Sequence, residues 1–462
     1  MHRSRWSLAL VALVSVVTGC GLVGVGSQRI PVTREAQLSR ARGVPGAELP
    51  FSPGFLWGVS MAGYQVEGGD TTSNWAVADR EGRLKESPGK AIDFWNRYEE
   101  DFDLAQRMGM TCVRLSLEWS RIEPERGRFD PAAIQRYHDM LTSLRRRGIE
   151  PLVTLSHFAY PAWLDNPRDG KEGGWVHPDT PKEFARFAAW AGQEYGADVK
   201  YWLTVNEPNT LAILTYLAGQ FPPFRINPFS FGISQDRQME GHRLAYAALH
   251  RVDPDAMVSF NPFVWKGRDS EPTAGQVNAR VSRVDHLRLL DIAAGRDPSM
   301  PGNTLDYVAF DYYYPTSPGD LTKVPSYWNW SVYPEGMYSV SKQLYQRYKL
   351  PLLVAENGIA TQGDRPREDG WTRPAYLVNH LAQLRRAMAE NIPVLGYCHW
   401  SLVDNYEWGS FQPSFGLFAI DRRDVNLTRL RTDAVDVYEN IAKRNALGYE
   451  VLERYLGRPA SR

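Results

Sequence analysis

Two glutamates each follow a short apolar segment and are followed at once by a residue that interrupts regular structure. Glu207 lies in WLTVNEP at 202–208, and Glu356 lies in LLVAENG at 352–358. The apolar and β-branched residues before each carboxyl predict a strand with the glutamate at its exit. Two carboxyl groups that converge on one bond can hydrolyse a glycosidic linkage, because one donates a proton while the other attacks or activates water. Either glutamate alone can equally be a solvated loop charge, so the fold must decide.

Composition limits the other classes of function. The chain has 462 residues and is 43% hydrophobic, enough for one large domain or two. Lys plus Arg and Asp plus Glu are balanced at 53 each, so charge does not indicate a nucleic-acid partner. No Cys or His spacing indicates a metal site, and no cofactor is expected. Cys112 and Cys398 fall in strand-like segments and are predicted to be free, buried thiols.

The amino-terminal segment is separable from the rest. Arg3 and Arg5 precede an apolar stretch at 8–17 that is too short to span a bilayer, and the stretch leads to VTGC ending in Cys20. This pattern resembles the lipobox of bacterial lipoproteins, in which cleavage leaves a lipid-bearing cysteine. A secretory signal with an incidental cysteine is the alternative. The lipobox interpretation predicts export, lipid anchoring to a bacterial membrane through Cys20, and a division into signal peptide 1–20, tether 21–49 and folded domain 50–462.

Short apolar segments alternate with amphipathic ones along the remaining chain. Strands are predicted at 55–60, 112–118, 151–157, 201–207, 257–263, 307–313, 352–356 and 394–402. Helices are predicted at 98–108, 132–147, 181–195, 241–252, 280–294, 339–348 and 373–390. The repeated strand–helix alternation predicts an α/β fold with a single closed (β/α)8 TIM barrel and loop insertions. A doubly wound open sheet is the alternative, but residues 58–63 lack its glycine-rich fingerprint.

Polar residues gather at the predicted carboxyl ends of these strands, where such barrels carry their chemistry. They are Arg114, Glu118, His157, Asn206, Glu207, Asn261, Asp311, Tyr313, Glu356, Asn357, His399 and Trp400. A set of this kind around the whole ring indicates a site rather than scattered surface residues.

Several motifs together resemble glycoside hydrolase family one, over about residues 51–438. They are FLWG at 55–58, YQVEG at 64–68, RLSLEWSRI at 114–122, TVNEP at 204–208, ENG at 356–358 and WSLVDNYEW at 400–408. The resemblance implies a (β/α)8 barrel and a retaining β-glycosidase that works through a glycosyl-enzyme intermediate. Carried over by motif, Glu207 is the general acid/base and Glu356 the nucleophile, with Arg114 and Tyr313 supporting Glu356. Retention requires the two carboxyls to lie about 5–5.5 Å apart.

The resemblance also implies the residues that bind the sugar. They are Gln65, His157, Asn206 and Glu407 as hydrogen-bonding groups, with Trp400 and Trp408 as stacking and flanking aromatics. A core histidine and a tryptophan plug are the alternative interpretations of His157 and Trp400. Family members that act on 6-phosphosugars usually lack the Glu407–Trp408 pair, which favours an unphosphorylated sugar.

The chain departs from the family pattern near the site, and one departure is Ala355, before Glu356, where the family usually has threonine. After the third strand, HFAYP at 157–161 stands where members commonly have HWDLP, so this wall of the subsite is expected to differ. In the sixth strand, Asp311 stands where the family has asparagine. A charged aspartate would oppose ionisation of the nucleophile, so either Asp311 stays protonated or Arg114 and other donors offset it. Replacing Asp311 with asparagine is then expected to shift the acidic limb of the pH–rate profile.

The leading hypothesis is therefore a lipid-anchored, retaining exo-β-glycosidase acting on a β-glucoside-like or β-galactoside-like substrate. A transglycosylase of the same family is the alternative within enzymes, because both carboxyls serve either reaction. A catalytically inactive carbohydrate-binding lipoprotein is the alternative from another class. The sequence does not predict the oligomeric state.

Overall fold

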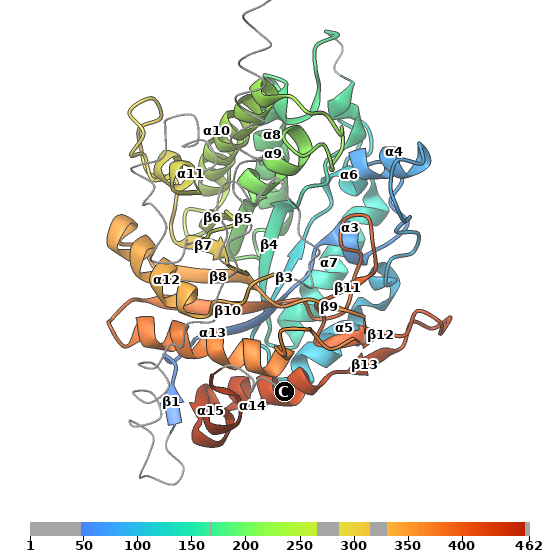
Figure 1. Cartoon of the computed structure of the whole chain (residues 1–462). Helices are drawn as coiled ribbons and strands as arrows, with labels where there is room; N and C mark the ends of the chain where they lie inside the picture. The colour runs from blue at the N-terminus through green and yellow to red at the C-terminus, as the bar shows by residue number, and fades with distance from the viewer. Residues whose placement is uncertain (1–47, 167–168, 266–285, 315–329, 364, 458–462) are drawn as a thin grey trace, which may run out of the picture.

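The computed structural model describes residues 48–166, 169–265, 286–314, 330–363 and 365–457 (Figure 1). The predicted signal peptide with Cys20, and the predicted tether up to residue 47, lie outside the described residues. Within the described ranges, no helix is long and apolar enough to cross a membrane.

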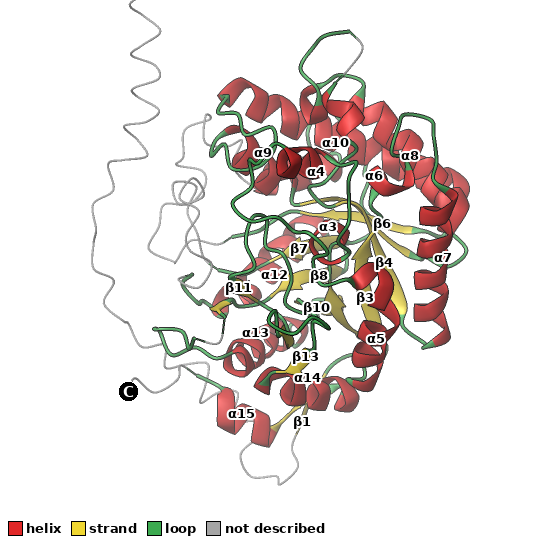
Figure 2. Cartoon of the chain, turned by 90° about the vertical axis from the view of Figure 1, so that its right-hand side faces the viewer, coloured by secondary structure: helices red, strands yellow, loops and turns green. Residues whose placement is uncertain are grey.

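Eight parallel strands form the centre of the molecule, in the order β6-β5-β4-β3-β2-β10-β8-β7. The two outer strands meet just beyond β6, where Phe263 pairs with Asp311 in parallel and the Val264 amide donates to the Asp311 carbonyl at 2.9 Å. Figure 2 shows the strands surrounded by helices. The predicted (β/α)8 barrel is confirmed. Its strands are β2 (Leu56–Ser60), β3 (Cys112–Ser116), β4 (Glu150–Ser156), β5 (Tyr201–Asn206), β6 (Met257–Asn261), β7 (Val308–Asp311), β8 (Leu352–Asn357) and β10 (Val394–Trp400).

Each barrel strand overlaps a predicted one, and several predictions run too far at the carboxyl end. Glu118, His157 and Glu207 lie one or two residues beyond the last residue of β3, β4 and β5. At the mouth of a barrel the chain leaves the sheet for a loop, so regular pairing stops before these polar side chains. Sequence periodicity alone cannot locate that point.

The helices that follow the strands begin with local signals that the sequence carries. In α7 (Pro131–Arg146), Pro131 occupies the first turn, and the Asp130 side chain accepts a hydrogen bond from the Ala132 amide at 2.8 Å. Besides α7 and α10 (Pro228–Val252), the helices that overlap predicted ones are α5 (Phe94–Arg107), α8 (Thr180–Tyr195), α11 (His286–Ala293), α12 (Glu335–Tyr348) and α13 (Arg373–Met388). Residues 280–285 of one predicted helix lie outside the described residues.

The segment after β5 was not predicted to be helical. Pro208 ends the strand but also begins helix α9 (Pro208–Tyr216), directly after Glu207. Proline suits the first turn of a helix because the amide hydrogen it lacks would have no partner there. The next helix, α10 (Pro228–Val252), begins well before the predicted start at 241. Its first half buries Ser234, Gln235 and Gln238, so the apolar periodicity that marks a helix is absent there.

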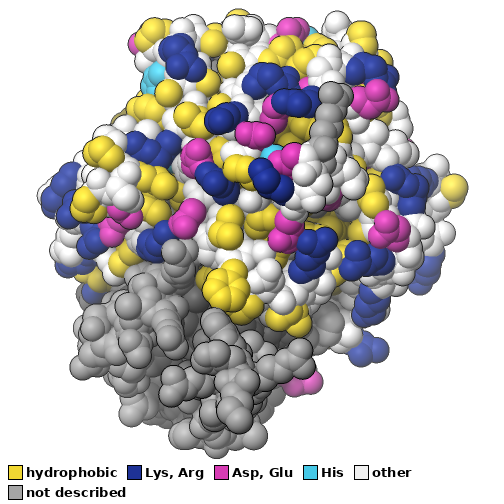
Figure 3. Space-filling model, turned by 90° about the horizontal axis from the view of Figure 1, so that it is seen from above, with side chains coloured by type: hydrophobic (Ala, Val, Ile, Leu, Met, Phe, Trp, Pro, Cys, Tyr) yellow, Lys and Arg dark blue, Asp and Glu magenta, His cyan; other side chains and the backbone are white. Residues whose placement is uncertain are grey.

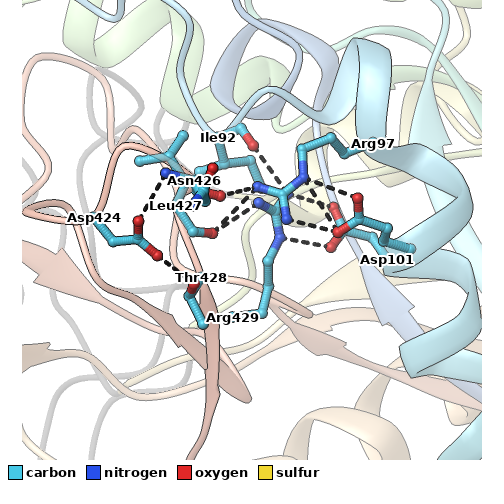
Figure 4. A network of polar contacts seen from close by, with 9 residues as sticks. Ile92, Arg97, Asp101, Asp424, Asn426, Leu427, Thr428 and Arg429 are labelled. Atoms are coloured by element: carbon cyan, nitrogen blue, oxygen red, sulfur yellow. Dashed lines mark hydrogen bonds and ion pairs between the residues drawn. The ribbon is translucent and has the colours of Figure 1, made fainter.

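Short antiparallel strand pairs lie outside the eight-stranded barrel. In the pair of β12 (Phe418–Ile420) with β13 (Arg429–Arg431), Arg429 reaches α5 and forms a buried ion pair with Asp101, with Nε to Oδ1 at 2.9 Å (Figure 4). The remaining elements are β1 (Glu48–Pro50) paired with β14 (Ala446–Gly448), β9 (Thr361–Gln362) paired with β11 (Pro413–Ser414), helices α3 (Gly63–Val66), α4 (Asn74–Arg80), α6 (Trp119–Ile122), α14 (Asp433–Arg444) and α15 (Tyr449–Tyr455), and 3-10 turns at Ala162–Asp165 and Gly174–Val176.

An apolar layer fills the barrel below its mouth. It contains Leu152, Leu203, Leu353 and the predicted free thiols Cys112 and Cys398, both of which are unpaired and buried. Side chains two positions apart on a strand share a face, so the residue two places after each cysteine also faces the interior. Those residues are Arg114 and Trp400. The strands therefore present an apolar layer and, above it, a polar layer at the mouth.

The face of the molecule seen from above carries side chains of both charges (Figure 3). Figure 3 shows basic and acidic side chains interspersed over the face seen from above. This distribution agrees with the formal net charge of zero.

Candidate active site

Glu207 and Glu356 converge at the carboxyl end of the barrel. One carboxyl oxygen from each, together with one from Asp311, lie within 4.8 Å of one another. Both glutamates are nearly buried, at 7% and 4% exposure. Glu207 adopts a left-handed backbone conformation, with φ 39°, and its amide donates to the Asn261 carbonyl at 2.7 Å. The separation fits the short spacing of retaining glycosidases rather than the roughly 6.5–9.5 Å of inverting ones.

Both oxygens of Glu356 accept hydrogen bonds. The Arg114 guanidinium donates to Oε1 in a buried ion pair, and the Tyr313 hydroxyl donates to Oε2 at 2.6 Å. Arg114 is itself fixed by a bond from Nε to the Thr154 hydroxyl at 2.9 Å. Burial raises the pKa of Glu356, and Arg114 and Tyr313 oppose that rise. These donors favour the carboxylate that a nucleophile requires.

Glu207 has a different electrostatic environment. Burial, and then the nearby charge of Glu356, raise the pKa of Glu207 to about 8, while a hydrogen bond with Thr210 opposes the rise. A carboxyl group with this pKa is protonated at neutral pH and can donate a proton. The environment of Glu207 therefore favours its protonated form, and the donors on Glu356 favour its ionised form. These are the forms that a general acid and a nucleophile require.

Arg114 also connects the nucleophile to the predicted sugar-binding residues. Its Nη2 donates to Asn206 Oδ1 at 2.6 Å, and the Asn206 amide nitrogen lies 3.3 Å from His157 Nε2. Burial, and then the charge of Arg114, lower the pKa of His157 well below its usual value, so its ring is neutral. The His157 ring stacks on Trp400 with centroids 5.7 Å apart. The structure therefore brings Asn206, His157 and Trp400 together beside Glu356.

Glu407 and Trp408 form the adjoining part of the site. The Trp400 indole nitrogen donates to Glu407 Oε1 at 3.0 Å, and burial raises the pKa of Glu407 to about 8. Trp408 stacks on Tyr64, with centroids 5.9 Å apart and planes at 8°. Gln65 is fully buried and donates to Asn405 and to the Tyr406 carbonyl, both at 3.0 Å, rather than lining the pocket.

The pocket wall includes aromatic and apolar residues that the motifs did not identify. Besides the predicted residues, it is lined by Phe158, Thr210, Ile213, Leu214, Phe221, Phe263, Tyr314, Trp330 and Phe415. Four of the nine, Phe158, Thr210, Phe263 and Tyr314, lie within four residues of the end of a barrel strand, and this position was the available signal for them. Their apolar character resembles ordinary core packing, so residue type did not distinguish them.

The three carboxyls are the one group of acidic, Cys or His side chains in the described ranges that is close enough to share a metal ion. Arg114 already supplies a positive charge to Glu356, and both oxygens of Glu356 are hydrogen-bonded. These donors stabilise the Glu356 carboxylate, so the arrangement fits acid–base and nucleophilic chemistry.

Relatives of this chain share both the fold and the enzyme class. The chain is 30% identical over 489 residues to the β-galactosidase of Sulfolobus acidocaldarius, covering 87% of this chain and 97% of that protein. It is 28% identical over 452 residues to β-glucosidase A of Thermotoga maritima, covering 86% and 98%. The solved structure of a β-glycosidase from Pyrococcus horikoshii superimposes with a TM-score of 0.77 at 29% identity, covering 90% and 99%. A 6-phospho-β-glucosidase of Dickeya chrysanthemi is 28% identical, covering 85% and 97%.

The match to the family extends over most of the barrel. The sequence profile described as Glycosyl hydrolase family 1 matches residues 47–286 and 313–447, which include both glutamates and Arg114. Together with the paired carboxyls at the barrel mouth, this match establishes that the chain belongs to glycosyl hydrolase family 1.

Proposed function

We propose that the protein is a retaining exo-β-glycosidase that hydrolyses an unphosphorylated β-glucoside or β-galactoside by double displacement. The observation that carries this proposal is the pair of closely spaced carboxyls in unlike environments. Glu356 accepts hydrogen bonds from Arg114 and Tyr313, whereas the pKa of Glu207 is raised to about 8.

In the first step, a carboxylate oxygen of Glu356 attacks the anomeric carbon while protonated Glu207 gives its proton to the departing glycosidic oxygen. The product is a glycosyl ester of Glu356 and a free alcohol. Esterification removes the negative charge that raised the pKa of Glu207. Glu207 then ionises more readily and takes a proton from water as the water attacks the anomeric carbon, which releases the sugar and restores Glu356.

The sugar side of the pocket supports an unphosphorylated substrate. Glu407 and Asn206 offer hydrogen-bonding groups, and Trp400 offers an aromatic face. Among the described lining residues there is no lysine or arginine to bind a phosphate. Above pH 8, where Glu407 ionises despite its raised pKa, a phosphate group would also face the charge of this carboxylate, and like charges repel.

The leaving group is expected to be apolar or aromatic. Because Glu207 protonates the glycosidic oxygen, the leaving group lies beside Glu207 and the helix α9 that follows it. There, Thr210, Ile213 and Leu214 line the pocket. Two of these three side chains cannot hydrogen-bond to a second sugar, so an aryl or alkyl group gains more from this wall.

A panel of aryl β-glycosides tests the activity, with product analysis to separate hydrolysis from transfer to another hydroxyl. A 2-deoxy-2-fluoro glycoside of the preferred sugar should trap the intermediate, and mass spectrometry of the peptides should find the label on Glu356. Binding of sugars with no release from any substrate would favour an inactive binding protein. A label on another residue would overturn the nucleophile assignment.

We also propose that the protein is exported and lipid-anchored at Cys20. The support is the charged start, the apolar stretch at 8–17 and the VTGC sequence. Expression in a bacterium fed a radiolabelled fatty acid tests this proposal. The wild-type protein should carry label in the membrane fraction and the Cys20→Ala variant should carry none. Equal labelling of both proteins, or of neither, would contradict the proposal.

A further inference from the structure

The third carboxyl of the site, Asp311, is held in place by the barrel itself. It is fully buried, and at the seam between β6 and β7 its amide donates to the Pro262 carbonyl at 3.1 Å. Its carbonyl accepts from Val264 at 2.9 Å, and it pairs in register with Glu356 on β8. The side chain therefore cannot move out to solvent without opening the seam.

The hydrogen bonds around Asp311 leave one of its oxygens without a donor. The Asn261 side-chain nitrogen donates to Asp311 Oδ2 at 2.5 Å and to Asn206 Oδ1 at 2.6 Å, which uses both of its hydrogens. Asp311 Oδ1 is buried and accepts no hydrogen bond from the described residues. If Asp311 were ionised, Oδ1 would share the negative charge while buried without a hydrogen-bond donor. Such a group lowers the stability of the folded protein. A protonated Oδ1 instead needs an acceptor, and the carboxyls of Glu207 and Glu356 lie within 4.8 Å.

The charges that face Asp311 also favour its neutral form. Glu207 follows β5, Glu356 lies on β8, and Arg114 on β3 is the cation in this group. Arg114 is already paired with Glu356. Burial, then Glu356 and then Glu207 raise the pKa of Asp311 well above its usual value.

The remaining titratable side chains around the cluster supply no further positive charge. Tyr313 gives its hydroxyl hydrogen to Glu356, His157 on the β4 side is neutral because its pKa is lowered, and burial raises the pKa of Glu407. One positive charge therefore faces three carboxyls, and it is engaged by Glu356.

We propose that Asp311 remains protonated and acts as a positioning residue that donates a hydrogen bond from Oδ1 to Glu207. This inference rests on the proposed function for its role in catalysis. Such a hydrogen bond would oppose the rise in the pKa of Glu207. The bond matters most in the second step, when Glu207 must be a carboxylate, because a donor stabilises that form. Asp311 then has the shape and the hydrogen bonding of the family's asparagine.

This arrangement changes the expectation for Asp311→Asn. A neutral acid and an amide both accept from Asn261 and donate to Glu207, so both limbs of the pH profile of kcat/KM should stay within about 0.3 units of the wild type. In Asp311→Ala the donor is lost. Its alkaline limb should move upward, and hydrolysis of the 2-deoxy-2-fluoroglycosyl enzyme should slow about tenfold, as expected for loss of a hydrogen bond to a charged group. Thermal unfolding of each variant serves as the folding control.

Infrared difference spectroscopy of wild type against Asp311→Asn, at neutral pH, reads the protonation state without turnover. The carbonyl stretch of a protonated carboxyl should be present in the wild type and absent from the variant. No such band, or a downward shift of both limbs by a unit or more in Asp311→Asn, would show that Asp311 is charged and overturn the inference. An inactive protein that still has the band would instead refute the proposed function and leave the protonation of Asp311 established. If Asp311→Ala does not fold, the pH profile of Asp311→Asn and the infrared difference spectrum still show whether Asp311 is protonated.

Discussion

Arg114 and Glu356 form a buried ion pair that joins β3 to β8 across the barrel mouth. The same guanidinium bonds Asn206 on β5 and is held by Thr154 on β4. The Arg114 side chain on β3 thus bonds side chains on β4, β5 and β8, and the residue on β8 is the nucleophile. Such a pair contributes little net stability while both members are present, but loss of one member leaves a buried charge without a partner.

The first prediction concerns Arg114→Gln. Without the guanidinium, Glu356 loses its compensating charge, its pKa rises further, and less of it is ionised. We expect kcat/KM to fall at least about 10²-fold and the acidic limb of its pH profile to move upward. Steady-state kinetics over a pH series measures both quantities.

Arg429→Lys is the matched control, because Arg429 forms a buried ion pair with Asp101 away from the pocket. That variant should lower the melting temperature and leave the pH limbs in place. An Arg114→Gln variant whose acidic limb does not move would show that Arg114 does not hold Glu356 ionised.

The second prediction separates the roles of the two glutamates. The alkaline limb of kcat/KM should fall near pH 8, because burial and the charge of Glu356 raise the pKa of Glu207 to about that value and the acid must be protonated. Glu207→Ala should keep the first step for substrates with good leaving groups, and azide should then restore turnover and give a β-glycosyl azide. Glu356→Ala with azide should give an α-glycosyl azide. The opposite pairing of products would exchange the two assignments.

The sequence predicts the barrel well because its strands alternate with amphipathic helices and polar residues mark the strand exits. Glu207 and Glu356 both occupy such exits, and their convergence follows from barrel closure alone. Helix α9 was not predicted, because Pro208 is compatible with both a loop and a first helical turn. The protonation of a buried side chain depends on its neighbours in space. For this reason the sequence left two alternatives for Asp311, and the bonds of Asn261 favour one of them.

The third prediction concerns stability against pH. The folded-state pKa of Glu207 is raised to about 8, from an ordinary value near 4.5. Between these values the folded protein binds more protons than the unfolded chain, so Glu207 contributes a loss of stability as pH rises through this window. Glu207→Gln removes that contribution, and its melting temperature should exceed that of the wild type by more at pH 8 than at pH 5. Glu125→Gln, at an exposed position, should show no such difference. A pH-independent difference for Glu207→Gln would contradict the raised pKa.

The fourth prediction tests the selection against phosphorylated sugars. In assays at about pH 9, above the pKa of about 8 to which burial raises Glu407, Glu407→Gln keeps the shape of the side chain and an oxygen for the Trp400 indole, but removes the carboxylate charge that a sugar phosphate would meet. We expect kcat/KM for an aryl β-glucoside to fall about tenfold or more, since an amide accepts hydrogen bonds from sugar hydroxyls less strongly than a carboxylate. For the 6-phosphate of the same substrate kcat/KM should fall less or rise, so the ratio between the two substrates decreases. Glu125→Gln should leave the ratio unchanged. Equal losses for both substrates would mean that Glu407 binds the sugar without discriminating against phosphate.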